Sequence, residues 1–164
     1  MSTNIADVRD FLSLRRIALV GVSRNPKDFS RVLFREMCQK GYEMVPVNPT
    51  TSELEGKRCF ARVQEIDPRV EGALLLTASR DTAQVVRDCS EAGIRMIWMH
   101  RGGGPGSVSQ EAVDFCRQQG IHLVEGHCPF MFLPSTPFIH RVHGFFLKLK
   151  GAYPREVTSA PRAA

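Results

Sequence analysis

The chain of 164 residues is 43% hydrophobic and 24% charged, a composition typical of one globular domain with a real core. Its net charge of +5 is mild and suits an anionic small molecule, and because no basic run is interleaved with aromatic residues we expect no nucleic-acid partner. No apolar run approaches the roughly 20 residues that cross a bilayer, and the N-terminus lacks the basic start and apolar stretch of a secretory signal, so we expect a cytoplasmic protein with no membrane partner.

The first part of the chain has the pattern helix, strand, helix, strand. The opening helix is amphipathic and carries Ile5, Val8 and Leu12 on one face. The continuous apolar run 17–20 is typical of a strand that is covered on both sides. A second helix, which ends at Gly41, and a second strand follow, and they are marked by Val32, Leu33, Met37, Cys38 and the segment 42–47.

The middle of the chain contains a loop, a third strand and a third helix. The loop after residue 50 is expected to hold a small turn of helix near 63–66, and the apolar run 73–76 predicts the strand. Ser79 is the expected N-cap of the helix that follows. The core face of that helix is expected to include Ala83, Val86 and Cys89.

Two more strands are expected at 94–99 and 121–124. Between them, Ser107 and Gln110 form a capping-box pattern, which predicts a helix that continues through Cys116. The glycine run between Gly102 and Gly106 comes directly before it. This run either admits a ligand or only adds flexibility.

Strands and helices therefore alternate from residue 16 to residue 124. Right-handed crossovers then give an α/β fold with a Rossmann-like, doubly wound parallel sheet of five strands. Ligands of such sheets bind at the carboxyl ends of the strands, near the switch in strand order. We expect a single domain over 1–150, closed by a phenylalanine-rich C-terminal helix, and a flexible tail over 151–164.

The segment RRIALVGVSRNPKDFSR joins the first strand to the second helix. Gly21 lets the backbone turn sharply off the strand, and Asp28 or Ser30 can cap the helix. Uncapped amides at the helix start, together with the helix dipole, favour an anion such as a pyrophosphate; alternatively, the segment is a plain turn with solvated charges. Further donors and positive charge are available there from Ser23, Arg24, Lys27, Ser30 and Arg31.

The second strand ends in Pro46-Val47-Asn48-Pro49, with no acidic residue before Glu53. A nicotinamide-binding unit usually places Asp or Glu here to accept hydrogen bonds from the ribose hydroxyls, so the sequence does not favour NAD. Walker-type nucleotide binding is not favoured either, because no GxxxxGK[ST] motif exists. Taken alone, Asn48-Pro49 can also be a simple strand stop.

Taken together, IALVGVSRNP, GYEMVPVNP followed by LEGKRCF, IRMIWM and the closing HCP resemble the stand-alone CoA-binding domain proteins, relatives of the N-terminal CoA-binding domain of succinyl-CoA synthetase alpha subunits. The resemblance covers residues 15–128 and implies a Rossmann-like sheet that binds coenzyme A (CoA). It implies a phosphate loop lined by Gly21, Val22, Ser23 and Arg24 with Ser30 at the helix start, an adenosine end at Val47, Asn48 and Pro49, a pyrophosphate or pantetheine path beside Thr77 and Ala78, and Met99 further along that path.

Charge agrees with this interpretation. CoA carries several phosphate charges, and Arg24, Lys27 and Arg31 are cations placed to meet them. A 3′-phosphate would make an acidic residue after the second strand unfavourable, and Asn48 stands there instead. The resemblance therefore predicts that CoA is the ligand.

No catalytic group is evident. Acyl-CoA synthetases of this kind use a phosphorylated histidine from a further domain, so we expect no such activity here, and no Ser-His-Asp pattern with a nucleophile elbow appears. His140 and His143 lack a helically spaced carboxylate or thiol and are better explained as a polar helix face than as a metal site. Five scattered cysteines without a CxxC pair favour free thiols in a reducing compartment. Cys128 is either a redox thiol near bound CoA or a small core thiol.

The sequence thus favours a binding module that holds CoA or an acyl-CoA through its phosphates without catalysis of its own. Two alternatives stay open. One is a small NADP-dependent oxidoreductase in which Arg24 accepts the 2′-phosphate. The other is a regulatory interaction protein whose phenylalanine-rich helix docks on a partner or on another copy of the chain, so a homo-oligomer is an open question.

Overall fold

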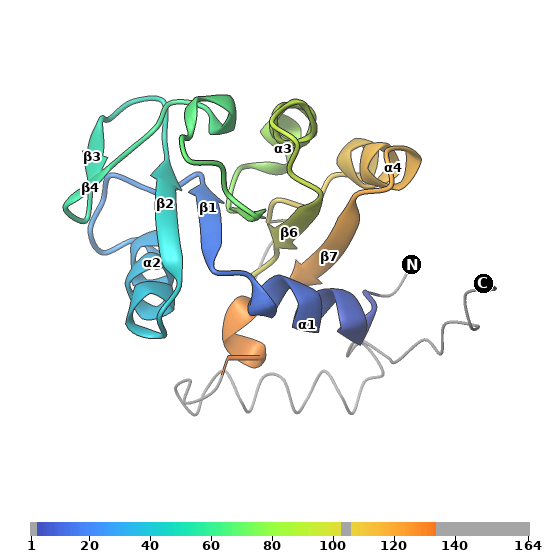
Figure 1. The fold of residues 1–164 in the computed structure, drawn as a ribbon, viewed down its shortest axis with the longest axis horizontal. Helices are drawn as coiled ribbons and strands as arrows, with labels where there is room; N and C mark the ends of the chain where they lie inside the picture. The colour runs from blue at the N-terminus through green and yellow to red at the C-terminus, as the bar shows by residue number, and fades with distance from the viewer. Residues whose placement is uncertain (1–2, 103–105, 134–164) are drawn as a thin grey trace.

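In the computed structural model, residues 3–102 and 106–133 are described, and they form a central sheet with helices on both faces (Figure 1). The five strands of this sheet are parallel and lie in the order β2-β1-β5-β6-β7. Their bounds are β1 Arg16–Val20, β2 Glu43–Val47, β5 Gly72–Leu75, β6 Met96–His100 and β7 His122–His127. The predicted Rossmann-like α/β fold with five parallel strands is confirmed.

Two helices cover each face of the sheet. In Figure 1, α1 and α2 lie on one side and α3 and α4 on the other. Two short 3-10 turns, η1 and η2, complete the described elements. The bounds are α1 Ile5–Ser13, α2 Phe29–Gln39, α3 Ser79–Glu91, α4 Gln110–Gln118, η1 Val63–Glu65 and η2 Pro129–Met131. The predicted C-terminal helix, the tail, and His140 and His143 lie outside the described residues.

Each strand divides its side chains between two apolar clusters, one on each face. From β1, Ala18 and Val20 belong to the cluster under α3 and α4, whereas Ile17 and Leu19 belong to the cluster under α1 and α2. All four side chains are buried. A strand that is buried on both faces gains from apolar residues at every position, which is why the run 17–20 shows no alternation.

The strand order reverses at β1, which lies between β2 and β5. Val20 at the end of β1 pairs with Val47 of β2 on one side and with Leu75 of β5 on the other. The carboxyl ends of these three strands are therefore level with one another. This is the switch point at which ligands bind in open α/β sheets.

A hairpin at the outer edge of the sheet was not predicted. Strands β3 Glu53–Leu54 and β4 Lys57–Arg58 form a two-stranded antiparallel sheet. Its turn, Glu55-Gly56, has φ of +53° and +69°, as a type I′ turn requires. The chain then returns to β2, where Phe60 accepts from the Asn48 amide and donates to the Pro46 carbonyl. The hairpin thereby protects the free edge of β2.

Two predicted helix caps are wrong. The N-cap of α3 is Ala78, with no side-chain hydrogen bond, and Ser79 is the first helical residue. The N-cap of α4 is Ser109 rather than Ser107. The hydroxyl of Ser107 is buried and instead lies 2.8 Å from the Leu75 carbonyl oxygen and 2.9 Å from that of His100, where it satisfies buried strand ends.

The predicted core faces are mostly confirmed. In α3, Ala83, Val86 and Cys89 are buried as expected. In α2, Val32 is 39% exposed, and the neighbouring Phe34 is buried in its place. No helix in the described part of the chain is both long and apolar enough to cross a bilayer.

Candidate functional site

The site begins at Gly21, directly after β1. Its φ of +90° lies in the region that favours glycine, and its amide donates to the Val47 carbonyl over 3.1 Å. A Cβ at this position would lie 2.9 Å from the carbonyl carbon of Leu76 and 3.1 Å from the amide nitrogen of Thr77. Glycine is therefore required here, because the first loop passes directly against the backbone that follows β5.

The loop from Ser23 to Ser30 is held by its own side chains. The Ser23 amide donates to Oγ of Ser30 over 2.8 Å, and the Asn25 amide donates to Oγ of Ser23 over 3.1 Å. The Lys27 amide donates to Oδ1 of Asn25 over 3.0 Å. Asp28 is the N-cap of α2, and its carboxylate accepts from the amide and the hydroxyl of Ser30. Such a loop needs little rearrangement to receive a ligand.

The expectation of uncapped amides at the start of the helix is only partly correct. Because Asp28 takes the Ser30 amide, the first turn of α2 already has an anionic partner. In the loop itself, the amides of Val22 and Arg24 make no hydrogen bond within residues 3–102 and 106–133. Of these two residues, Val22 is fully buried and Arg24 is exposed, so the Arg24 amide is the unpaired backbone donor of this loop that a ligand can reach.

Arg31 connects the loop to the β3–β4 hairpin. Its side chain is buried, its Nε lies 2.7 Å from Glu55 Oε1, and its Nη1 donates to the carbonyls of Ser23 and Arg24. Arg35 adds a second contact of 2.7 Å to the same carboxylate oxygen. Burial alone would raise the pKa of Glu55, but the hydrogen bonds from Arg31 and Arg35 lower it below its usual value. Glu55 therefore joins the hairpin turn to the loop, a link that sequence reasoning missed.

Asn48 joins the second loop to the first. Its Nδ2 donates to the Val22 carbonyl over 2.7 Å, and its Oδ1 accepts from the amide and the hydroxyl of Thr50. Val47 is buried and Pro49 is exposed beside it. The residues predicted from the first and second loops are thus brought together at one edge of the sheet.

The third loop, at the start of α3, lies at the same edge. The hydroxyls of Thr77 and Thr82 are 2.9 Å apart, and that of Thr82 lies 3.1 Å from the Ala78 carbonyl oxygen. If the Thr82 hydroxyl proton goes to the Ala78 carbonyl, the Thr77 hydroxyl donates to Thr82 and keeps both of its lone pairs as acceptors for a ligand. The third loop thus begins beside the first, since a Cβ on Gly21 would lie 3.1 Å from the Thr77 amide nitrogen.

The end of β6 contributes a buried histidine. Met99 is fully buried within the cluster under α3 and α4, whereas the next residue, His100, ends the strand with 9% of its surface exposed. The His100 ring stacks on Phe29 at 4.9 Å, and no described residue is a partner for its Nε2. Burial lowers the pKa of His100 to about 4, so the ring is neutral at pH 7. Buried polar side-chain atoms are usually hydrogen-bonded, which makes Nε2 of His100 a candidate ligand contact at this edge of the sheet.

The end of β7 carries His127 and Cys128. Burial and the charge of Arg101 lower the pKa of His127. Burial raises the pKa of the Cys128 thiol, so the thiol is protonated at pH 7 and has little thiolate character. Among the residues that the structure describes, no three His, Cys, Asp or Glu side chains lie close enough together to hold a metal ion.

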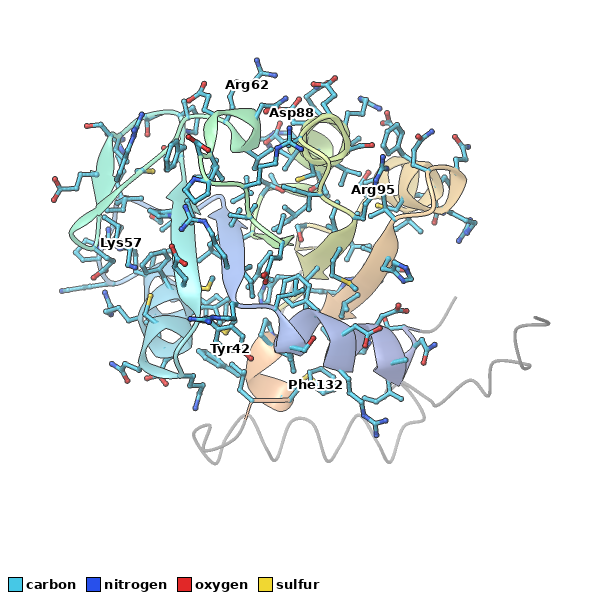
Figure 2. All side chains as sticks on the ribbon, in the orientation of Figure 1. Tyr42, Lys57, Arg62, Asp88, Arg95 and Phe132 are labelled. Carbon is cyan, nitrogen blue, oxygen red and sulfur yellow. The ribbon has the colours of Figure 1, made fainter. Side chains whose placement is uncertain are left out.

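A small cavity of about 140 Å³ lies away from this edge, between η1 and the end of α3, where Val63, Val70 and Ile94 line it. Nearby, Arg62 and Asp88 form an ion pair of 3.4 Å that joins η1 to α3 (Figure 2). Its lining residues Val70 and Ile94 come just before β5 and β6 in the chain, so the cavity lies at the amino ends of these strands. It therefore does not belong to the candidate site.

Comparison with known proteins shows that most of the chain matches one family. The sequence pattern of the family described as CoA binding domain matches residues 15–134. The chain is 27% identical over 124 residues to the uncharacterized protein YneT of Bacillus subtilis, a match that covers 75% of this chain and 89% of YneT.

Two matches to proteins from Pyrococcus furiosus extend the comparison. The chain is 24% identical over 126 residues to the alpha subunit of ADP-forming acetate–CoA ligase II, covering 72% of this chain but only 27% of that subunit. The structure of a conserved hypothetical protein superposes with a TM-score of 0.63 at 31% identity, over 70% of this chain and 95% of the other.

Proposed function

The chain belongs to the CoA binding domain family, and we propose that it binds coenzyme A or an acyl-CoA at the carboxyl edge of its sheet without catalysing a reaction. The observation that carries the proposal is the convergence of three strand-end loops. The Gly21 backbone lies so close to Thr77 that a Cβ would not fit between them, and the Asn48 side chain donates to the Val22 carbonyl. The name of one relative, acetate–CoA ligase, agrees with this ligand.

The diphosphate binds along the loop from Gly21 to Asp28. The exposed amide of Arg24 is its backbone donor, whereas Val22 is buried and lines the loop from within. Arg24 and Lys27 supply the charge, because both are exposed and neither forms an ion pair within the described part of the chain. Arg31 acts indirectly, because its guanidinium already binds Glu55 and two loop carbonyls. It keeps the loop in the shape that the phosphates require.

The two ends of the ligand run in opposite directions from the loop. The adenosine lies at Val47, Asn48 and Pro49. None of these three residues has an acidic side chain that would repel a phosphate on the ribose. The pantetheine arm passes Thr77 and Ala78 and runs toward the end of β6, where Met99 is fully buried below the surface and His100 follows it. The Nε2 of His100, which has no partner among the described residues, contacts a polar group of the arm.

The chemistry of the nearby groups supports binding rather than turnover. His100 is neutral at pH 7 with a pKa near 4, so it is a weak base. The raised pKa of Cys128 keeps its thiol protonated. Neither group has the properties of an activated nucleophile or a general base.

A ligand panel tests the proposal. CoA, acetyl-CoA, NAD, NADP and ATP are each added to the purified chain, and thermal unfolding is followed. A ligand at a hundredfold excess over its Kd stabilises the folded state by about 2.7 kcal/mol. Stabilisation by CoA or acetyl-CoA and not by NAD supports the proposal; a response to NADP with none to CoA contradicts it.

A further inference from the structure

Arg58, at the end of the β3–β4 hairpin, is an exposed cation that lies over an aromatic ring. Its guanidinium carbon lies 4.7 Å from the centre of the Phe60 ring. The ring itself is only 7% exposed and packs with Val47 in the cluster under α3 and α4. A rigid aromatic face therefore holds a side chain that would otherwise move freely in solvent.

Backbone pairing places Phe60, the residue that carries this cation on its ring, beside the proposed adenosine end of the site. Phe60 pairs with Val47 in a parallel bridge, and its carbonyl accepts from the Asn48 amide over 2.9 Å. The Val47 carbonyl in turn accepts from the Gly21 amide over 3.1 Å. Phe60, over whose ring Arg58 lies, is thus joined to the phosphate loop through two consecutive pairings at the end of β2.

The charge of Arg58 is also uncommitted. Among the ion pairs of the described residues, none includes Arg58, although Glu53 is its direct neighbour across the hairpin. By contrast, Arg31 and Arg35 both bind Glu55. Because Arg58 contacts Phe60 through the face of its guanidinium, the N–H groups around the edge of that plane stay available for a fork-like contact to a phosphate.

We propose that Arg58, held on the Phe60 ring, binds the 3′-phosphate on the ribose of CoA and so distinguishes CoA from dephospho-CoA. The inference rests on the proposed CoA binding and adds a specificity residue that lies outside the phosphate loop. The 3′-phosphate is the only group that differs between the two ligands. It is a dianion near neutral pH, and a planar cation on the ring of Phe60, whose carbonyl accepts from the Asn48 amide, matches it in charge and shape.

Isothermal titration of CoA and dephospho-CoA into the wild type and into Arg58→Gln tests the inference. We expect the wild type to prefer CoA by about tenfold or more, as for a charged hydrogen-bonded pair. Arg58→Gln should bind CoA only as well as dephospho-CoA, and its affinity for dephospho-CoA should be unchanged. Arg58→Lys, which keeps the charge and loses the fork, should retain part of the preference.

Lys57→Gln is the matched control, because Lys57 is an exposed cation on the same hairpin (Figure 2) and precedes Arg58 in β4. It removes the same charge, so it should retain the wild-type preference for CoA. Equal losses of preference in Lys57→Gln and Arg58→Gln would reduce the effect to general electrostatics and overturn the inference.

The remaining outcomes separate the two proposals. If the wild type binds CoA and dephospho-CoA equally, or if Arg58→Gln keeps the wild-type ratio, the role of Arg58 is overturned while CoA binding stands. If the wild type binds neither ligand, both proposals fall.

Discussion

Replacement of Gly21 by alanine probes the point where the first and third loops meet. The new Cβ would lie 2.9 Å from the carbonyl carbon of Leu76, 3.0 Å from its oxygen and 3.1 Å from the Thr77 amide nitrogen. All three atoms belong to the backbone, so no side chain can rotate away to make room. The loops must therefore move apart, and the Thr77 amide moves with them.

Gly41 provides a matched control, because its φ of +93° is close to the +90° of Gly21 but a Cβ at this position would meet no atom within 4 Å. Placing an L-residue in this region costs about 1–2 kcal/mol at either site. At Gly21 alone, the forced backbone shift adds about 1–3 kcal/mol, as overpacking does elsewhere. Gly21→Ala should thus be the more destabilised variant, and the difference between the two isolates the steric conflict.

Urea unfolding measures the two free energies, provided that the m-value is unchanged between the variants. Titration with CoA then measures affinity, which we expect to fall about tenfold or more in Gly21→Ala, equivalent to about 1.4 kcal/mol, and to stay at the wild-type level in Gly41→Ala. If Gly21→Ala matched Gly41→Ala in stability and bound CoA like the wild type, the close approach of the two loops would play no part in binding.

Three further predictions concern the same edge of the sheet. Asn48→Asp should weaken CoA binding about tenfold or more in a titration, because it replaces the Nδ2 donor to Val22 with a negative charge beside the phosphates; unchanged affinity would contradict this placement. Glu55→Gln should lower the urea midpoint at pH 7 and have less effect at acidic pH: since the folded state lowers the pKa of Glu55, its contribution is present above the unfolded pKa and is lost as pH falls through the folded one. A pH-independent difference would disprove this role. The folded state also lowers the pKa of His100, to about 4, so the unfolded chain binds more protons between pH 6.5 and 4 and stability should fall over that range. In His100→Gln, the fall in stability with falling pH should be shallower. NMR titration of the wild type measures the pKa of the His100 ring directly, and an ordinary value would contradict the predicted effect of burial.

The fold follows from local patterns because its central strands are buried on both faces. The run 17–20 is apolar at every position, and both of its sides pack against helices. The turn after α2 was equally predictable, since Gly41 has the positive φ that a helix end requires. The β3–β4 hairpin has strands of two residues each, which is too short for a periodic signal.

The meeting of the three strand-end loops was predictable, but the contacts within the candidate site were not. The switch in strand order brings Gly21, Asn48 and Thr77 together, as the sequence predicted. The engagement of Arg31 by Glu55 joins residues 24 positions apart, and no local pattern specifies it. The same holds for Ser107, whose hydroxyl satisfies strand-end carbonyls instead of capping a helix. Polar contacts of this kind join residues that are distant in the sequence, so only the folded structure shows which groups meet.

A crystal structure of the chain with bound CoA is the most direct test of the central claim. We predict that the diphosphate lies on the loop between Gly21 and Asp28, within hydrogen-bonding distance of the Arg24 amide, with the adenosine beside Asn48. A structure in which CoA occupies another surface, and in which that loop contacts no phosphate, would contradict the account.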